Sequence, residues 1–63
     1  MDREELEELA GRINDLVERL TDLTYNALRE QTAGNTQFKD IEKKLSSVRR
    51  SLLKAESTLR NLN

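Results

Sequence analysis

Apolar residues recur along the first half of the chain at alternating intervals of three and four residues. A repeat that averages 3.5 residues places its members on one face of a helix and is typical of a coiled-coil seam. The pattern therefore predicts an amphipathic helix over residues 2–32. The predicted seam of this helix consists of Leu6, Leu9, Ile13, Leu16, Leu20, Leu23 and Ala27.

The second half of the chain repeats the same spacing over eight apolar positions. The chain contains no Pro and is rich in Leu, Glu, Lys and Arg, all of which favour helix. We therefore predict a second helix over residues 36–62. Its predicted seam consists of Phe38, Ile41, Leu45, Val48, Leu52, Ala55, Leu59 and Leu62.

Weak helix formers cluster between the two runs, over residues 32–36. Gly34 can adopt the left-handed conformation that ends a helix, so we predict a turn at residues 33–35. Asp2 is suited to cap the first helix, and Asn35 or Thr36 is suited to cap the second.

Folding the chain at Gly34 brings seam residues whose numbers add to 68 opposite each other, so that Leu16 faces Leu52. The seams match along the whole length. We therefore predict an all-α fold, a single domain of residues 1–63 in which two helices form an antiparallel helical hairpin, or two-helix coiled coil. The alternative is one continuous rod, because the interval between Ala27 and Phe38 is also compatible with a coiled-coil stutter. Gly34 and Asn35 in mid-helix argue against the rod.

A hairpin of 63 residues has a small core. Its gain from burial barely exceeds the loss of about 1.5 kcal/mol of conformational entropy per residue, so a second copy is the simplest source of further stability. We therefore expect a homodimer that forms a four-helix bundle. A second stripe beside the seam is the candidate interface, although Ala10 and Val17 could instead widen the seam within one chain. The candidate interface consists of Ala10, Val17, Thr24 and Leu28.

Charge is divided unevenly along a chain whose net charge is −1. Residues 1–33 carry nine acidic and four basic side chains, whereas residues 34–63 carry three acidic and seven basic ones. A basic stripe on the second helix could bind phosphate groups, and the alternative is a solvated face that keeps the chain in solution. This candidate basic face consists of Lys39, Lys43, Arg50 and Lys54.

The chain lacks both Cys and His, which excludes disulfides, thiolate nucleophiles and imidazole metal ligands. Neither glycine belongs to a phosphate-binding loop. We therefore expect no catalytic, cofactor-binding or metal-binding residues and no enzymatic activity. Because no apolar run is long enough to span a membrane and the N-terminus is acidic, we expect a soluble, cytoplasmic protein with no membrane partner.

These patterns predict a small protein–protein interaction or oligomerisation module that acts through coiled-coil packing of helices. An adaptor, a small chaperone or an inhibitor would all fit, with a second copy or another helical protein as the partner. The alternative function is a dimeric nucleic-acid-binding regulator that uses the candidate basic face.

Overall fold

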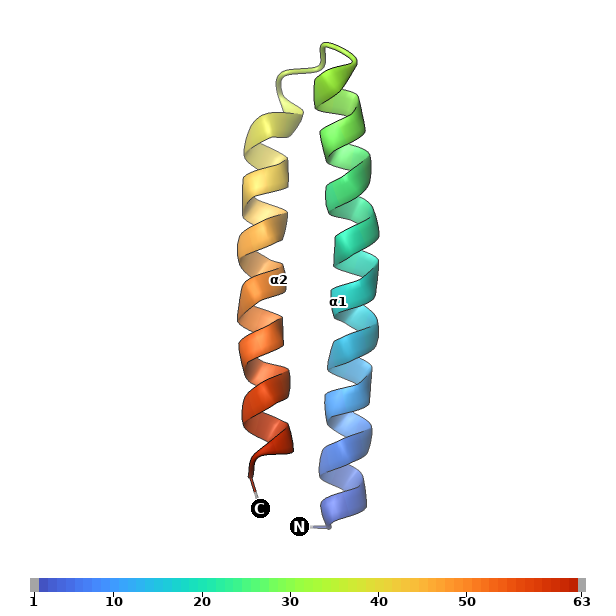
Figure 1. The fold of residues 1–63 in the computed structure, drawn as a ribbon, viewed down its shortest axis with the longest axis vertical. Helices are drawn as coiled ribbons and strands as arrows, with labels where there is room; N and C mark the ends of the chain where they lie inside the picture. The colour runs from blue at the N-terminus through green and yellow to red at the C-terminus, as the bar shows by residue number, and fades with distance from the viewer. Residues whose placement is uncertain (1, 63) are drawn as a thin grey trace.

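The computed structural model describes residues 2–62, which form two antiparallel helices joined by a short turn (Figure 1). Helix α1 spans Arg3–Thr32 and helix α2 spans Phe38–Arg60. The Cα atoms extend over 49 × 14 × 11 Å, so the molecule is a short rod. The predicted all-α hairpin is therefore confirmed, and the alternative of one continuous helix is wrong.

The predicted cap of α1 is confirmed. Asp2 has an extended backbone, with φ −86° and ψ 138°, and its carboxylate accepts a hydrogen bond of 3.1 Å from the backbone N–H of Glu4. This bond satisfies one of the backbone donors that a helix leaves free at its N-terminus. Glu4 and Glu5 add negative charge in the first turn, where the helix dipole favours it.

The turn begins where α1 ends, and it contains Gly34 in the left-handed region with φ 103°. The N–H of Asn35 donates to the carbonyl of Glu30 at 3.0 Å, and the N–H of Gly34 donates to the carbonyl of Gln31 at 3.1 Å. This pair of bonds is the Schellman motif, which satisfies the last carbonyls of a helix. The predicted turn at Gly34 is therefore confirmed.

Helix α2 starts later than predicted, because residues 36 and 37 belong to the turn. Its N-cap is Gln37, whose side chain makes no capping bond, so the prediction that Asn35 or Thr36 would cap α2 is wrong. The backbone carbonyls of Asn35 and Thr36 accept bonds of 3.1 Å from the first two N–H groups of the helix instead. The Asn35 side chain is held by Glu30, to whose carboxylate it donates at 2.9 Å.

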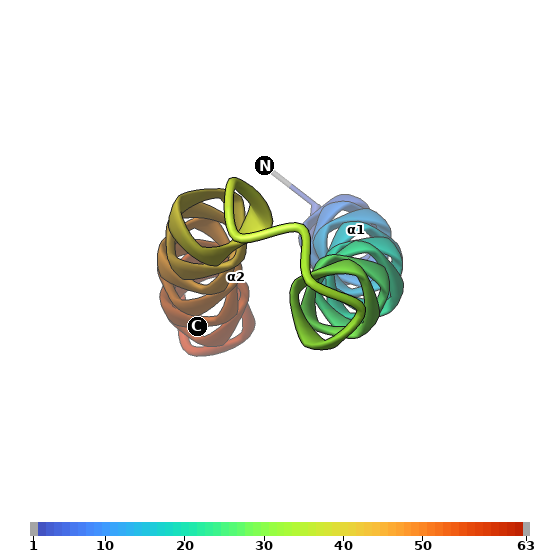
Figure 2. The same cartoon turned by 90° about the horizontal axis from the view of Figure 1, so that it is seen from above.

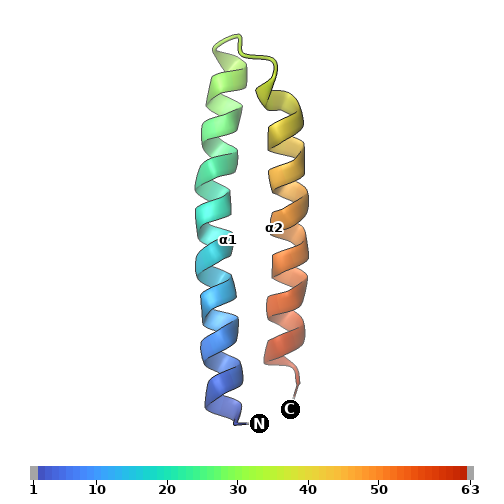
Figure 3. The same cartoon turned by 180° about the vertical axis from the view of Figure 1, so that it is seen from behind.

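The view along the rod shows the two helices next to each other, with the turn passing from the end of α1 to the start of α2 (Figure 2). The view from behind shows α2 lying beside the longer α1 (Figure 3). Within residues 2–62, all packing between secondary-structure elements therefore occurs along this one contact.

We predict opposite effects for the same substitution at the two glycines. A Cβ atom at either position would have no atom outside its local surroundings within 4 Å, so backbone conformation alone decides the outcome. Gly34→Ala should destabilise the protein by about 1–2 kcal/mol because alanine is strained in the left-handed region. Gly11→Ala should stabilise it by about 1 kcal/mol because alanine is the better helix former.

Urea unfolding followed by circular dichroism at one fixed protein concentration measures both effects. Stabilisation by Gly34→Ala would contradict the left-handed turn.

Candidate interaction surface

Two rows of α1 side chains face α2. One row belongs to the predicted seam, and the other contains smaller residues of the candidate interface. Ala10, Val17 and Ala27 are buried, with exposed fractions of 0%, 5% and 4%, and the other residues of the two rows are half-buried. The two rows consist of Leu6, Ile13, Leu20 and Ala27, and of Ala10, Val17 and Thr24.

Two rows of α2 side chains face α1 in the same way, and all of them are half-buried. One row is apolar and belongs to the predicted seam, whereas the other is charged. The apolar row consists of Phe38, Leu45, Leu52 and Leu59, and the charged row of Glu42, Arg49 and Glu56. The long charged residues of α2 thus share the contact with the small Ala10 and Val17 of α1.

The prediction that the whole seam lies between the two helices is wrong for every second member. Six of these large side chains have exposed fractions between 43% and 56%, and Ala55 is also exposed. The reason is that α1 is rotated so that its row of Ala10 and Val17 turns inward, where small side chains let the helices approach, and α2 is rotated so that its charged row turns inward. The exposed members are Leu9, Leu16, Leu23, Ile41, Val48, Ala55 and Leu62, and we call them the apolar face.

The apolar face lies on one side of the hairpin. In α1 each leucine of the apolar face comes one residue before a residue of the inward row of Ala10, Val17 and Thr24, as Leu16 before Val17. In α2 the same order holds, as Val48 before Arg49. An approximate twofold axis perpendicular to the plane of the hairpin relates two antiparallel helices, and such an axis leaves equivalent rows on the same side. The exposed rows of α1 and α2 therefore form one surface.

The candidate interface predicted from the sequence needs correction. Ala10 and Val17 are buried and Thr24 is half-buried, so these residues widen the contact within the chain and are not free to meet a partner. Leu28 is 44% exposed, but it lies on the side opposite the apolar face. The exposed apolar surface lies within the predicted seam itself, because each seam holds two apolar rows and the contact between the two helices encloses only one of them.

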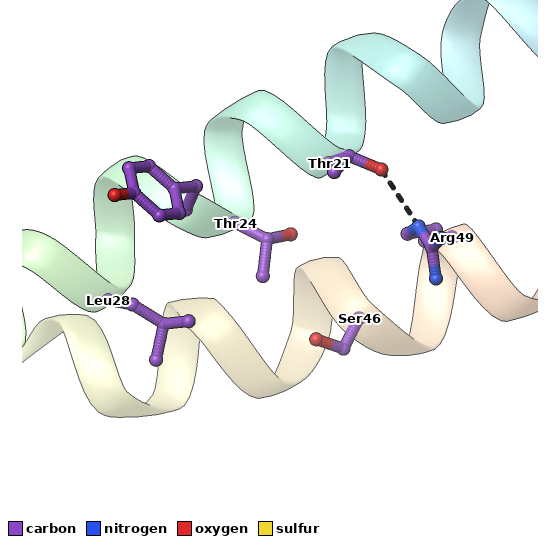
Figure 4. A pocket seen from close by; sticks show the side chains of 6 residues that line it. Thr21, Thr24, Leu28, Ser46 and Arg49 are labelled. Atoms are coloured by element: carbon purple, nitrogen blue, oxygen red, sulfur yellow. Dashed lines mark hydrogen bonds between the residues drawn. The ribbon is translucent and has the colours of Figure 1, made fainter.

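The opposite side of the hairpin carries a shallow depression of about 250 Å³ (Figure 4). Two of its polar side chains bind each other, since Arg49 Nε donates to Thr21 Oγ1 at 2.9 Å, and Thr21 Oγ1 donates in turn to the Val17 carbonyl at 3.0 Å. The depression is lined by Thr21, Thr24, Tyr25, Leu28, Ser46 and Arg49.

Two hydrogen bonds between the helices report their register. Asn14 Nδ2 donates to Glu56 Oε1 at 3.3 Å, and Arg49 donates to Thr21. In each pair the residue numbers add to 70, whereas the seam predicted pairs that add to 68. The observed pairs therefore differ from the predicted register by two residues, which is about 3 Å along the axis or about half a helical turn.

Glu56 is the most enclosed carboxylate of this contact, and its side chain is 13% exposed. Arg60 Nε donates to it at 2.9 Å, and Asn14 donates from the other helix. The hydrogen bond from Arg60 and then that from Asn14 lower the pKa of Glu56 below its ordinary value of 4.5, although burial acts in the opposite direction. Glu56 therefore favours the folded hairpin in its charged form.

The candidate basic face lies on the solvent-exposed part of α2, and all four of its cations are exposed. A neighbouring cation, Lys44, forms an ion pair with Asp40 of the same helix, with 2.8 Å between Lys44 Nζ and Asp40 Oδ2. The structure brings no aromatic side chain from the other helix to the four, since the ring of Tyr25 lies beside Arg29 on α1. Binding of nucleic acid to this face stays a prediction.

Comparison of the chain with protein-family models, with curated proteins and with solved structures gives no match in any of the three. Within residues 2–62, neither helix combines the length and the apolar character needed to cross a membrane. Over the same residues, no three acidic side chains gather in a way that could hold a metal ion. The apolar face is the largest group of exposed apolar side chains that the structure places on one side of the hairpin.

Glu56 should make stability depend on pH in the acidic range. Its pKa is lower in the folded chain than in the unfolded one, so its contribution is present above pH 4.5 and is lost as the pH falls below that value. Glu56→Gln should therefore be less stable than the wild type at pH 7, and the difference should shrink toward pH 3.

Thermal unfolding at a fixed concentration across this range measures the difference, with Glu18→Gln as the control for loss of one negative charge. A gap for Glu56→Gln that stays constant with pH would contradict the role of the carboxylate.

Proposed function

We propose that this protein is a non-enzymatic interaction module whose apolar face packs against helices of a partner, a second copy of the chain being the first such partner. The observation that carries the proposal is the apolar face, a continuous strip of heptad-spaced side chains with no covering element within residues 2–62. Such a strip is the surface that coiled coils and helical bundles use for association.

The hairpin by itself buries little. Among residues 2–62, the buried apolar side chains are those of Ala10, Val17 and Ala27, and no large side chain is fully enclosed. Each Leu or Ile that moves from water into a core contributes about 1.5–3 kcal/mol, and most of the large apolar side chains here remain partly in water. Association through the apolar face would supply the missing burial.

The accessible area supports the same conclusion. The chain exposes 4996 Å², whereas a folded monomer of its mass of 7.3 kDa is expected to expose about 4,200 Å². The excess of about 800 Å² equals the area that one partner contributes to a standard protein–protein interface. Burial of the apolar face in one interface of ordinary size would therefore reduce the accessible area of the chain to the value expected for its mass.

The spacing of the side chains on the apolar face also indicates what kind of partner would fit it. Heptad-spaced apolar side chains on two antiparallel helices accept the side chains of another helix or helix pair, aligned along the rod. An adaptor, a small chaperone or an inhibitor could use this surface, and a homodimeric four-helix bundle is the form that needs no other protein.

We predict that Leu16→Glu abolishes self-association, because it places a charge in the middle of the apolar face. Leu28→Glu is the matched control, since it makes the same change on the same helix at 44% exposure against 48%, but on the opposite side. Sedimentation equilibrium over a hundredfold range of concentration, with helicity measured on the same samples, gives the mass of each variant.

The wild type and Leu28→Glu should have twice the chain mass, and Leu16→Glu should have the chain mass whether it remains helical or unfolds. A monomeric wild type would contradict self-association. A dimer that survives Leu16→Glu but not Leu28→Glu would place the interface on the opposite side.

A further inference from the structure

The apolar face also determines how two copies fit together, an inference that rests on the proposed function. We infer that the second copy packs with its turn at the opposite end of the bundle, so that α1 lies beside α1 of the second copy and α2 beside α2. Two such hairpins form a four-helix bundle in which every helix is antiparallel to both of its neighbours.

Symmetry leaves two ways to place one apolar face on another. A twofold axis along the rod gives a same-end dimer, in which both turns lie at one end and α1 lies beside α2 of the second copy. A twofold axis across the rod gives an opposite-end dimer, in which each helix lies beside its own copy. Both are closed dimers with antiparallel neighbours, so the side chains must decide between them.

The same-end dimer fills the core unevenly. We call the seam residues of α1 and α2 whose numbers add to 68, such as Leu16 and Leu52, one layer, because this pairing lies within two residues of the contacts that the structure shows. In the same-end dimer each layer meets the identical layer of the second copy, because both hairpins run in the same direction. The layer that contains Ala55 would hold two alanines and two copies of Ile13, whereas the layer that contains Leu16 would hold four leucines. Helices at a constant separation cannot pack both layers well, since the first leaves voids and the second needs more space.

The opposite-end dimer fills the core evenly. The seams of the two α1 helices coincide from Leu9 to Ala27 when residue numbers that add to 36 are level, which places Leu16 beside Leu20 of the second copy. Beyond this stretch Leu6 is level with Glu30 of the second copy, at the end of the bundle. The layer with Ala55 then meets two leucines in place of a second alanine. In this arrangement one layer holds Ile13, Ala55, Leu23 and Leu45, the next outward holds Leu9, Leu59, Ala27 and Ile41, and the central one holds Leu16, Leu52, Leu20 and Val48.

Each of these layers contains at least three large side chains and at most one alanine. Two of them have the same composition of two Leu, one Ile and one Ala, although no residue of one belongs to the other. Near-equal layer volumes permit a constant helix separation along the bundle. This balance is the observation that selects the opposite-end dimer.

Charges at the edge of the apolar face are compatible with this choice. Arg12 comes near Asp22 of the second copy and Asp15 comes near Arg19, but the two copies of Arg19 also come close together beside the twofold axis. The same-end dimer would also pair opposite charges, as Asp15 with Lys54. Exposed pairs of this kind contribute at most about 1 kcal/mol each, so core packing outweighs them.

Disulfide cross-linking tests the arrangement. The chain has no Cys, so every disulfide must form between introduced cysteines. Ser51 follows Val48 by three residues and lies at the edge of the apolar face on α2, close to the point where the twofold axis would cross α2. Arg19 has the equivalent position on α1, three residues after Leu16. The variants are Ser51→Cys and Arg19→Cys, each oxidised alone and as a mixture, with Ser57→Cys on the outer side of α2 as the control.

In the opposite-end dimer each of the two edge variants cross-links to itself, at roughly tenfold or more the yield of Ser57→Cys, because neighbouring thiols reach millimolar effective concentration. The mixture then yields few disulfides between residues 19 and 51. Cross-links that form mainly between residues 19 and 51, and only in the mixture, would overturn the arrangement in favour of the same-end dimer.

Sedimentation of the reduced variants separates this outcome from failure of the proposed function. Reduced variants that are dimers but give the wrong cross-links refute the arrangement alone. Reduced variants and wild type that are all monomers refute self-association and, with it, the arrangement.

Discussion

Two helices that touch along one line can enclose only the rows of side chains that flank that line, and this constraint governs the whole molecule. Helix α1 carries three rows that are apolar or small, whereas α2 carries two apolar rows and a charged one, and the single contact between the helices encloses two rows of each. The third row of each helix remains in water as the apolar face, with leucines such as Leu16 about half exposed. The excess surface area and the argument for a partner both follow from this geometry.

The contact between the helices is partly polar, and this limits how much it stabilises the hairpin. Arg49 and Glu56 stand where an isolated two-helix coiled coil would gain more from apolar residues, and they bind Thr21 and Asn14 across the contact. Hydrogen bonds of this kind contribute modestly to stability, but they penalise a helix that slides out of register. The polar row therefore sets the register, and burial of the apolar face would supply stability.

Local chemistry made much of the fold predictable from the sequence. The N-cap at Asp2, the left-handed turn at Gly34 and the positions of both helices depend on interactions within a few residues, such as the hydrogen bonds of the Schellman motif. The start of α2 was less predictable, because Asn35 can cap a helix or bind Glu30, and the sequence does not rank these two uses.

The sequence by itself determined two heptad-patterned helices, the turn between them and their register to within half a turn. The tertiary structure alone decided how each helix is rotated about its own axis. Leu6, Ile13 and Leu20 belong equally to a seam completed by Leu16 and to one completed by Val17, since both have intervals of three and four residues. Spacing cannot distinguish these seams. Packing against α2 does, because the smaller row lets the two backbones approach and leaves the leucine row outside.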